Sequence, residues 1–364
     1  MKLQSIQALR ALAAVLVAYS HSIDLQMSFA VSRQQGFYAL QNFGAIGVDL
    51  FFVISGFIIT LVASRDVGAR TGARFLLKRF LRVNPVYYLA SLLFGLVTLL
   101  LSLHGGLPLG PLLARLWSGL VDTLLVVPTS GKPLGYAPLL IIGWTLAFEW
   151  LFYALFCLLI ALGLRGKAAG LCVLLGSLAS VGVVARSGDA RLRFVTNPIL
   201  LEFLLGVATC VLYREAARVP RWLPRACLLL GIAGYAYAIR FGFGEVSELL
   251  PTWTGRVSLE RVVRWGLPSA LVVAGCVLLE AHGALRRLWR IRFLQITGDA
   301  SYALYLTHLT VFAVLGFAYT TLGFGVPADA AVLLQVALAV AVAVVFYRRV
   351  EEPLLRALYA RAGF

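Results

Sequence analysis

Charged residues are scarce in this chain of 364 residues: 13% are Asp, Glu, Lys or Arg, whereas 61% are hydrophobic. A soluble domain has about 25% charged and 45–50% apolar residues. The composition therefore excludes an ordinary soluble globule and a disordered chain. Together with a mean hydropathy of +0.90, it predicts an all-α, polytopic membrane protein, because backbone groups in lipid must pair within helices.

Cysteine is also rare, and its spacing excludes two kinds of small stabilised domain. The five cysteines lie in or at the end of apolar stretches, and none has a CxxC or CxxH spacing. This excludes a disulfide-stapled secreted domain and a zinc site, and we expect neither a bound metal nor a permanently bound cofactor. We expect no signal peptide, because Arg10 interrupts the first apolar run and no small-residue cleavage site follows it.

Long apolar runs dominate what is present. About 20 apolar residues form one helical span, and we find ten such stretches without an internal repeat or a domain-sized linker. They predict a bundle of about ten transmembrane helices that forms one domain over residues 1–364. Segment 107–138 is rich in Gly and Pro, and we expect a long loop there. The ten stretches are 5–23, 43–63, 84–104, 139–163, 168–186, 196–213, 224–241, 264–281, 300–323 and 328–348.

Acidic residues are half as frequent as basic ones, which gives a formal charge of +16. Ten spans place both termini on one side of the membrane. If that side is the cytoplasm, its loops hold 21 basic residues, the opposite loops hold 10, and Arg10 lies within the first span. This bias follows the positive-inside rule. It predicts cytoplasmic termini and removes the need for a nucleic-acid partner.

Four ionisable side chains stand out within the apolar stretches, where such groups are costly and indicate function, and Glu202 and His308 are secondary candidates. The four are Arg10 and His21 in the first span, Asp49 in the second and Glu149 in the fourth. Arg10 and His21 are eleven residues apart, which puts them ~16 Å apart on one helix face. We expect both to face one cavity, with Arg10 toward the cytoplasm. The alternative for His21 is a buried histidine that bonds to a backbone carbonyl.

The position of Asp24 bears on the chemistry of His21. Histidine has an unperturbed pKa near neutrality, so His21 can serve as a general base. Asp24 follows three residues later, a spacing at which side chains meet on a helix. It either holds the imidazole in the tautomer that leaves Nε2 free, or it is a solvated residue at the helix end.

A basic cluster precedes the third span. Arg74, Lys78 and Arg82 follow an i, i+4, i+8 row, so we expect them to share a helix face. Arginine grips phosphate with a planar, bidentate fork. The cluster therefore fits a phosphorylated ligand at the cytoplasmic mouth, or contact with anionic lipid headgroups.

Six short motifs follow one another along most of the chain. In this order they resemble the acyltransferase-3 family of membrane acyltransferases, which includes bacterial carbohydrate O-acetyltransferases. Lys78 stands where the family more often has Arg, Asn84 precedes the proline, and Thr145 replaces Ser. We expect only the membrane core, without the periplasmic domain that the family often appends. The motifs are R-x10-H from Arg10 to His21, GVDLFFVISGFII at 47–59, KRFLRVNPVY at 78–87, WTLAFEWLFY at 144–153, GDASYALYLTH at 298–308 and EP at 352–353.

The resemblance implies an enzyme of the bacterial inner membrane. Its expected reaction moves an acyl group, commonly acetyl, from cytoplasmic acyl-CoA to a hydroxyl of a sugar, glycan or glycosylated small molecule. Lys78, Arg79 and Arg82 match the phosphates of CoA. Arg10 could stabilise the thioester oxyanion or bind pyrophosphate, and its distance from His21 favours pyrophosphate.

The remaining roles follow from the same resemblance. His21 is expected to deprotonate the acceptor directly or to carry the acyl group as an acyl-imidazole. Glu149 and Asp49 are expected to orient partners, because a buried acid beside Arg10 would supply its counter-charge. Tyr305 and His308 are expected either to bind the acceptor or to hold helices together.

Two other functions share some of these features. A transporter or flippase of a lipid-linked saccharide also buries charges, but it would be expected to show inverted repeats and broken helices, which we do not find. Another membrane acyltransferase class, the MBOAT type, would use a histidine late in the chain, such as His308. The acceptor stays open among lipopolysaccharide, exopolysaccharide, lipid-linked glycan and small metabolite, and so does the oligomeric state, with a homodimer as one option.

Overall fold

The computed structural model describes residues 3–28, 37–106, 108–126, 137–185, 187–322 and 328–364. These residues form a bundle of helices, and no strand occurs among them. The described part contains nine helical stretches that are long and apolar enough to cross a membrane. These findings confirm the all-α, polytopic bundle. The nine stretches are Gln4–Met27, Asn42–Ala63, Ala69–His104, Gly143–Ala161, Lys167–Ala185, Ala190–Arg214, Ser258–Ala281, Ser301–Leu322 and Asp329–Arg361.

Several stretches are built from more than one helix. The long helices are α1 (Gln4–Ser28), α2 (Ile46–Ala63), α3 (Ala69–His104), α5 (Gly143–Ala161), α6 (Lys167–Ala185), α8 (Leu201–Arg214), α12 (Leu267–Ala281), α15 (Ser301–Leu322) and α16 (Ala328–Phe346). The shorter helices include α11 (Ser258–Arg261), α14 (Arg292–Asp299) and α17 (Glu352–Arg361). A π-helical turn at Val262–Gly266 joins α11 to α12, and another at Tyr347–Glu351 joins α16 to α17.

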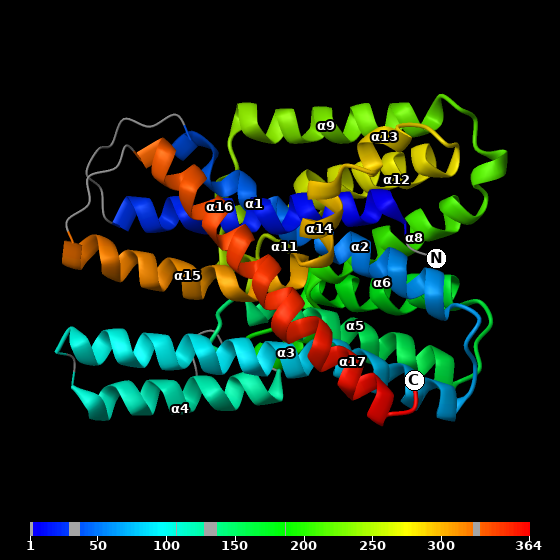
Figure 1. Ribbon diagram of the computed structural model, residues 1–364. Helices are drawn as coiled ribbons and strands as arrows, with labels where there is room; N and C mark the ends of the chain where they lie inside the picture. The colour runs from blue at the N-terminus through cyan, green and yellow to red at the C-terminus, as the bar shows by residue number, and fades with distance from the viewer. Residues whose placement is uncertain (1–2, 29–36, 107, 127–136, 186, 323–327) are drawn as a thin grey trace.

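The expected span at 224–241, which is not among these nine stretches, corresponds to α9 (Leu223–Phe241). This helix runs beside α12 and along the length of the bundle (Figure 1). It is not among the nine most apolar stretches, because Arg225 and Arg240 interrupt its ends. The two ends of the chain lie at the same end of the bundle (Figure 1), which an even number of crossings requires.

The prediction of a loop at 107–138 is wrong for about half of this segment. Its first part is helix α4 (Leu109–Leu125), which packs along α3 (Figure 1), while residues 107 and 127–136 lie outside the described residues. The prolines that suggested a loop, at 108 and 111, stand at the start of the helix, where proline is tolerated. Asp122, in the last turn of α4, accepts a hydrogen bond from the backbone N–H of Ala137 at 2.7 Å, which ties the chain that leads to α5 back to this helix.

Small residues let the central helices approach closely. A Cβ atom added at Gly56 of α2 would lie 2.1 Å from the carbonyl oxygen of Phe203, and one at Gly206 of α8 would lie 2.1 Å from that of Val53. Such close crossings are typical of membrane helices, which gain stability from tight packing rather than from burial against water. Helix α1 lies within the bundle and contacts α2, α12, α14, α15 and α16. The residues on α1 are therefore placed where several helices can meet them.

Candidate active site

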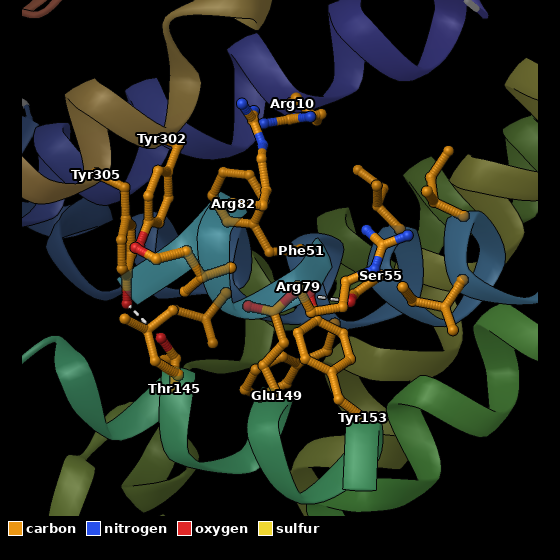
Figure 2. A pocket seen from close by; sticks show the side chains of 17 residues that line it. Arg10, Phe51, Ser55, Arg79, Arg82, Thr145, Glu149, Tyr153, Tyr302 and Tyr305 are labelled. Atoms are coloured by element: carbon orange, nitrogen blue, oxygen red, sulfur yellow. Dashed lines mark hydrogen bonds between the residues drawn. The ribbon is translucent and has the colours of Figure 1, made fainter. Parts of the chain in front are cut away.

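A cavity of about 160 Å³ opens among α1, α2, α3, α5 and α15. One wall is apolar and includes Phe51, Phe52 and Ile54 of α2. The polar side chains of the cavity come from all of these helices, and Figure 2 shows them converging on the cavity. The polar lining comprises Arg10, Ser55, Arg79, Arg82, Thr145, Glu149, Tyr153, Tyr302 and Tyr305.

Three guanidinium groups reach this cavity from two helices. Arg10 of α1 donates from Nε to Oγ of Ser301 at 3.1 Å, just where α15 begins. Nη1 of Arg82 lies 3.5 Å from Oε1 of Glu351, a carboxylate that is fully buried. Arg79 lies 5.9 Å above the ring of Tyr153, which holds its flat group at the cavity wall. Three cations that line one cavity are suited to binding an anionic ligand.

The carboxylate in the cavity is held by its neighbours. Glu149 of α5 accepts a hydrogen bond from Oγ of Ser55 at 2.9 Å and another from the hydroxyl of Tyr153, one turn later on the same helix. Ser55 projects from α2, so its bond joins α2 to α5, whereas the bond from Tyr153 lies within α5. Glu149, which is half-buried, and Arg10 line the same cavity, and the expected role of Glu149 as counter-charge stays a prediction.

The far end of the cavity is formed by hydroxyl groups. The hydroxyl of Tyr305 lies 2.8 Å from Oγ1 of Thr145 and donates to the carbonyl of Ile142 at 3.0 Å. The ring of Phe51 meets Tyr305 edge-on, with centroids 5.9 Å apart. Tyr305 therefore closes the cavity on the side that faces the middle of α15.

His21 lies outside this cavity, although Arg10 lines it. The His21 ring stacks on that of His308, with centroids 5.3 Å apart and an angle of 26° between the planes. Its Nδ1 lies 3.2 Å from Oδ2 of Asp24, so the i, i+3 contact expected for this pair is present. The His308 ring is also 6.3 Å from that of Tyr305. Tyr305 thus stands between the cavity and the two histidines.

Asp49 pairs with a different arginine from the one expected. It lies fully buried in α2 and receives two hydrogen bonds from Arg261, at 3.0 Å from Nε and 2.8 Å from Nη2. Arg261 is itself 2% exposed and also donates to the carbonyls of Val246 and Ala45. The structure therefore places Asp49 in a buried ion pair that fastens the 244–257 segment to the bundle, outside the cavity.

The basic row on α3 is divided between two places. Lys78 and Arg74 are exposed and lie over the ring of Phe364, at 4.7 and 5.4 Å from its centroid. Arg82 reaches the cavity together with Arg79, three residues before it. The cavity is therefore served by an i, i+3 pair and not by the i, i+4, i+8 row that the spacing suggested.

Sequence reasoning missed four residues that complete these contacts. Ser55 and Tyr153 both lie in quoted motifs, but a single hydroxyl in an apolar helix gave no separate signal. Arg261 was counted among loop arginines, although an apolar helix follows it directly. Glu351 adjoins the quoted Glu-Pro pair, which contains only the half-buried Glu352. Among the described residues, no cluster of three His, Cys, Asp or Glu side chains could hold a metal ion.

Comparison with known proteins identifies a family whose model matches this chain. The acyltransferase domain family matches residues 3–348 of the chain. The exopolysaccharide production protein ExoZ of Rhizobium meliloti is 32% identical over 330 residues, covering 87% of this chain and 92% of that protein. The acyltransferase MdmB of Streptomyces mycarofaciens is 25% identical, covering 99% and 93%. The nodulation protein 10 of Rhizobium leguminosarum is 25% identical, covering 83% and 81%. No solved structure matches the chain significantly.

Proposed function

Because the chain belongs to the acyltransferase domain family and is an acyltransferase, we propose that it moves an acyl group, acetyl in the first instance, from acyl-CoA to a hydroxyl of a sugar or glycan. The name of its relative ExoZ, an exopolysaccharide production protein, supports a glycan acceptor. In this proposal the donor occupies the cavity and His21 is the general base.

The observation that carries the proposal is the convergence of Arg10, Arg79 and Arg82 on one cavity. Glu149 and Glu351 offset two of these charges, so one positive charge remains for a ligand. CoA carries its phosphates at one end of the pantetheine arm and its thioester at the other. The phosphates fit the arginines because guanidinium groups bind phosphate in a bidentate way, and the arm then points toward Tyr305.

In this proposal His21 acts at the thioester end of the donor. Its Nδ1 faces Asp24 at 3.2 Å, so this nitrogen carries the hydrogen and Nε2 is left as a base. A hydroxyl needs such a base to become a useful nucleophile near neutral pH. In this proposal the arm of the donor spans the ~16 Å between Arg10 and His21 along one helix, and the Tyr305 side chain, which stands between the cavity and His21, moves aside to let it pass.

The arrangement also supports an orientation in the membrane. Arg10 lies near the start of α1, and Arg79 and Arg82 lie near the start of α3, at the end of the bundle where both chain termini lie (Figure 1). The excess of basic loop residues is on the same side. We assign this side to the cytoplasm of a bacterial inner membrane, where acyl-CoA is available, and we place acceptor entry toward the opposite side.

A transfer assay tests this proposal. Membranes that carry the wild-type chain are incubated with radiolabelled acetyl-CoA and a glycan extract of the host cell. We expect His21→Ala to abolish labelling and Arg79→Ala to raise the KM for acetyl-CoA. Arg74→Ala, a basic residue of the same helix outside the cavity, is the matched control and should leave that KM unchanged. Wild-type labelling that survives in His21→Ala would disprove the base assignment.

A further inference from the structure

His308 has a ring nitrogen whose state is fixed by its surroundings. It lies fully buried in the middle of α15, and its Nδ1 is 2.9 Å from the carbonyl oxygen of Leu304. A carbonyl can only accept a hydrogen bond, so Nδ1 must carry the hydrogen. In a neutral imidazole the other nitrogen, Nε2, is then a bare acceptor.

That acceptor has no hydrogen-bond donor among the residues that the structure describes. Buried polar atoms are nearly always paired, and an unpaired one in a native protein calls for an explanation such as a ligand or a catalytic role. Two aromatic side chains flank the His308 ring. Phe312 meets it edge-on with ring centroids 5.8 Å apart, and the centroid of the Tyr305 ring lies 6.3 Å away. Neither ring supplies a donor to Nε2.

The third neighbour is His21, stacked at 5.3 Å. Its side chain is 32% exposed, so it is the accessible member of the pair, and contact between an acceptor and the fully buried His308 requires the His21 ring to turn aside. With Nδ1 of His21 turned to Asp24, the stack offers two bare Nε2 atoms. One hydroxyl group has a single hydrogen and cannot donate to both. Two adjacent hydroxyl groups on one molecule can.

We propose that His308 contacts the acceptor and that the acceptor is a vicinal diol, such as neighbouring hydroxyls of a sugar ring. This inference rests on the proposed function. One hydroxyl gives its proton to Nε2 of His21 while its oxygen attacks the thioester carbonyl. The thiolate of CoA leaves and takes that proton from His21. The neighbouring hydroxyl keeps its O–H bond and donates a hydrogen bond to Nε2 of His308.

Two substitutions separate this role from helix packing. The side-chain amide nitrogen of His308→Asn can replace Nδ1, so this variant can keep the bond to Leu304 while it loses the acceptor at Nε2. The longer side chain of His308→Gln brings a carbonyl oxygen near the place of Nε2. A purely structural role predicts that Asn is the better substitute, and the proposed role predicts that Gln is.

The assay uses purified protein, radiolabelled acetyl-CoA and two probes that differ by one hydroxyl, cis-cyclohexane-1,2-diol and cyclohexanol. We expect the wild type to prefer the diol about tenfold in kcat/KM, the factor that one neutral hydrogen bond supplies. His308→Asn should remove this preference, and His308→Gln should restore part of it. The KM for acetyl-CoA should stay unchanged in both variants, and their thermal unfolding in detergent reports whether they fold.

The outcomes distinguish the two proposals. If the wild type transfers acetyl neither to the diol nor to a host glycan extract, the proposed function is wrong and this inference falls with it. If the wild type transfers acetyl but treats the diol and cyclohexanol alike, only this inference is overturned. Folded His308→Asn with a wild-type diol preference also overturns it, since Nε2 is then served by water or by nothing.

Discussion

Arg82 interacts with the buried carboxylate of Glu351 and, in the proposed function, with the donor. Glu351 is 0% exposed, Arg82 is 33% exposed, and their charged atoms are 3.5 Å apart. Removing one member of a buried ion pair leaves an uncompensated charge. Arg10 also interacts with Glu351 electrostatically, which offsets part of the loss. We therefore predict that Arg82→Met lowers the free energy of unfolding by about 3 kcal/mol, the lower end of the range for such pairs.

The same substitution removes one of the three cations in the cavity. A hydrogen bond between charged groups contributes about 1.5–3 kcal/mol, which corresponds to about 10–150-fold in affinity. We predict an increase of this size in the Kd for acyl-CoA, measured by titration calorimetry in detergent. Stability and donor affinity should thus fall together in Arg82→Met.

A second substitution takes the two effects apart. Glu351→Gln in the Arg82→Met background removes the stranded charge, so most of the lost stability should return in thermal unfolding. Donor affinity should not return, because the cavity still lacks a cation. The reasoning is refuted if Arg82→Met unfolds like the wild type, or if the double variant regains acyl-CoA affinity along with stability.

Three further predictions concern the bundle itself. Arg261→Met should cost more than about 3 kcal/mol of unfolding free energy, because the buried Asp49 loses its counter-charge; an unchanged melting temperature would contradict this. Gly206→Ala should lower stability by about 1–3 kcal/mol, because its Cβ would lie 2.1 Å from a backbone oxygen of α2. Gly176→Ala, which meets nothing within 4 Å, should match the wild type in the same melt. Glu280→Gln should lower the free energy of unfolding by about 1 kcal/mol and the melting temperature slightly, because this carboxylate accepts hydrogen bonds from the backbone N–H groups of Gln4 and Ser5 at the start of α1.

Hydropathy predicted the helices well because a span must be apolar throughout, whatever its neighbours. The same rule failed for α4, where leucines recur at helical spacing but proline and glycine flank them. It also gave α9 the same weight as the other spans, although Arg225 and Arg240 make this helix less apolar. Contact with lipid requires an apolar composition along a whole span, which hydropathy detects. The helical structure of α4 instead depends on the packing of one of its faces against α3, which hydropathy does not detect.

The candidate site was predictable in its residue types but not in its partners. Arg10 and His21 share a helix face within about 20°, yet only Arg10 lines the cavity. The reason is α15: its Tyr305 closes the cavity before the level of His21, and its His308 covers the His21 ring. Likewise, Asp49 carried a clear signal as a buried acid, but its partner Arg261 is 212 residues away. Helical periodicity assigns a direction to a side chain and says nothing about which helix stands there.

The length of α3 has a consequence for how a water-soluble donor could be reached. At about 1.5 Å per residue, its 36 residues extend about 54 Å, whereas the hydrocarbon layer is about 30 Å thick. About 24 Å of the helix therefore exceeds the hydrocarbon layer when it crosses at right angles, and the charges of Arg70, Arg74 and Lys78 favour water over lipid, which assigns this excess to the start of α3. In the proposed binding mode the nucleoside of the donor lies in water beside this part of α3. Only the phosphates and the pantetheine arm enter the cavity, so the most hydrophilic part of the donor stays outside the membrane.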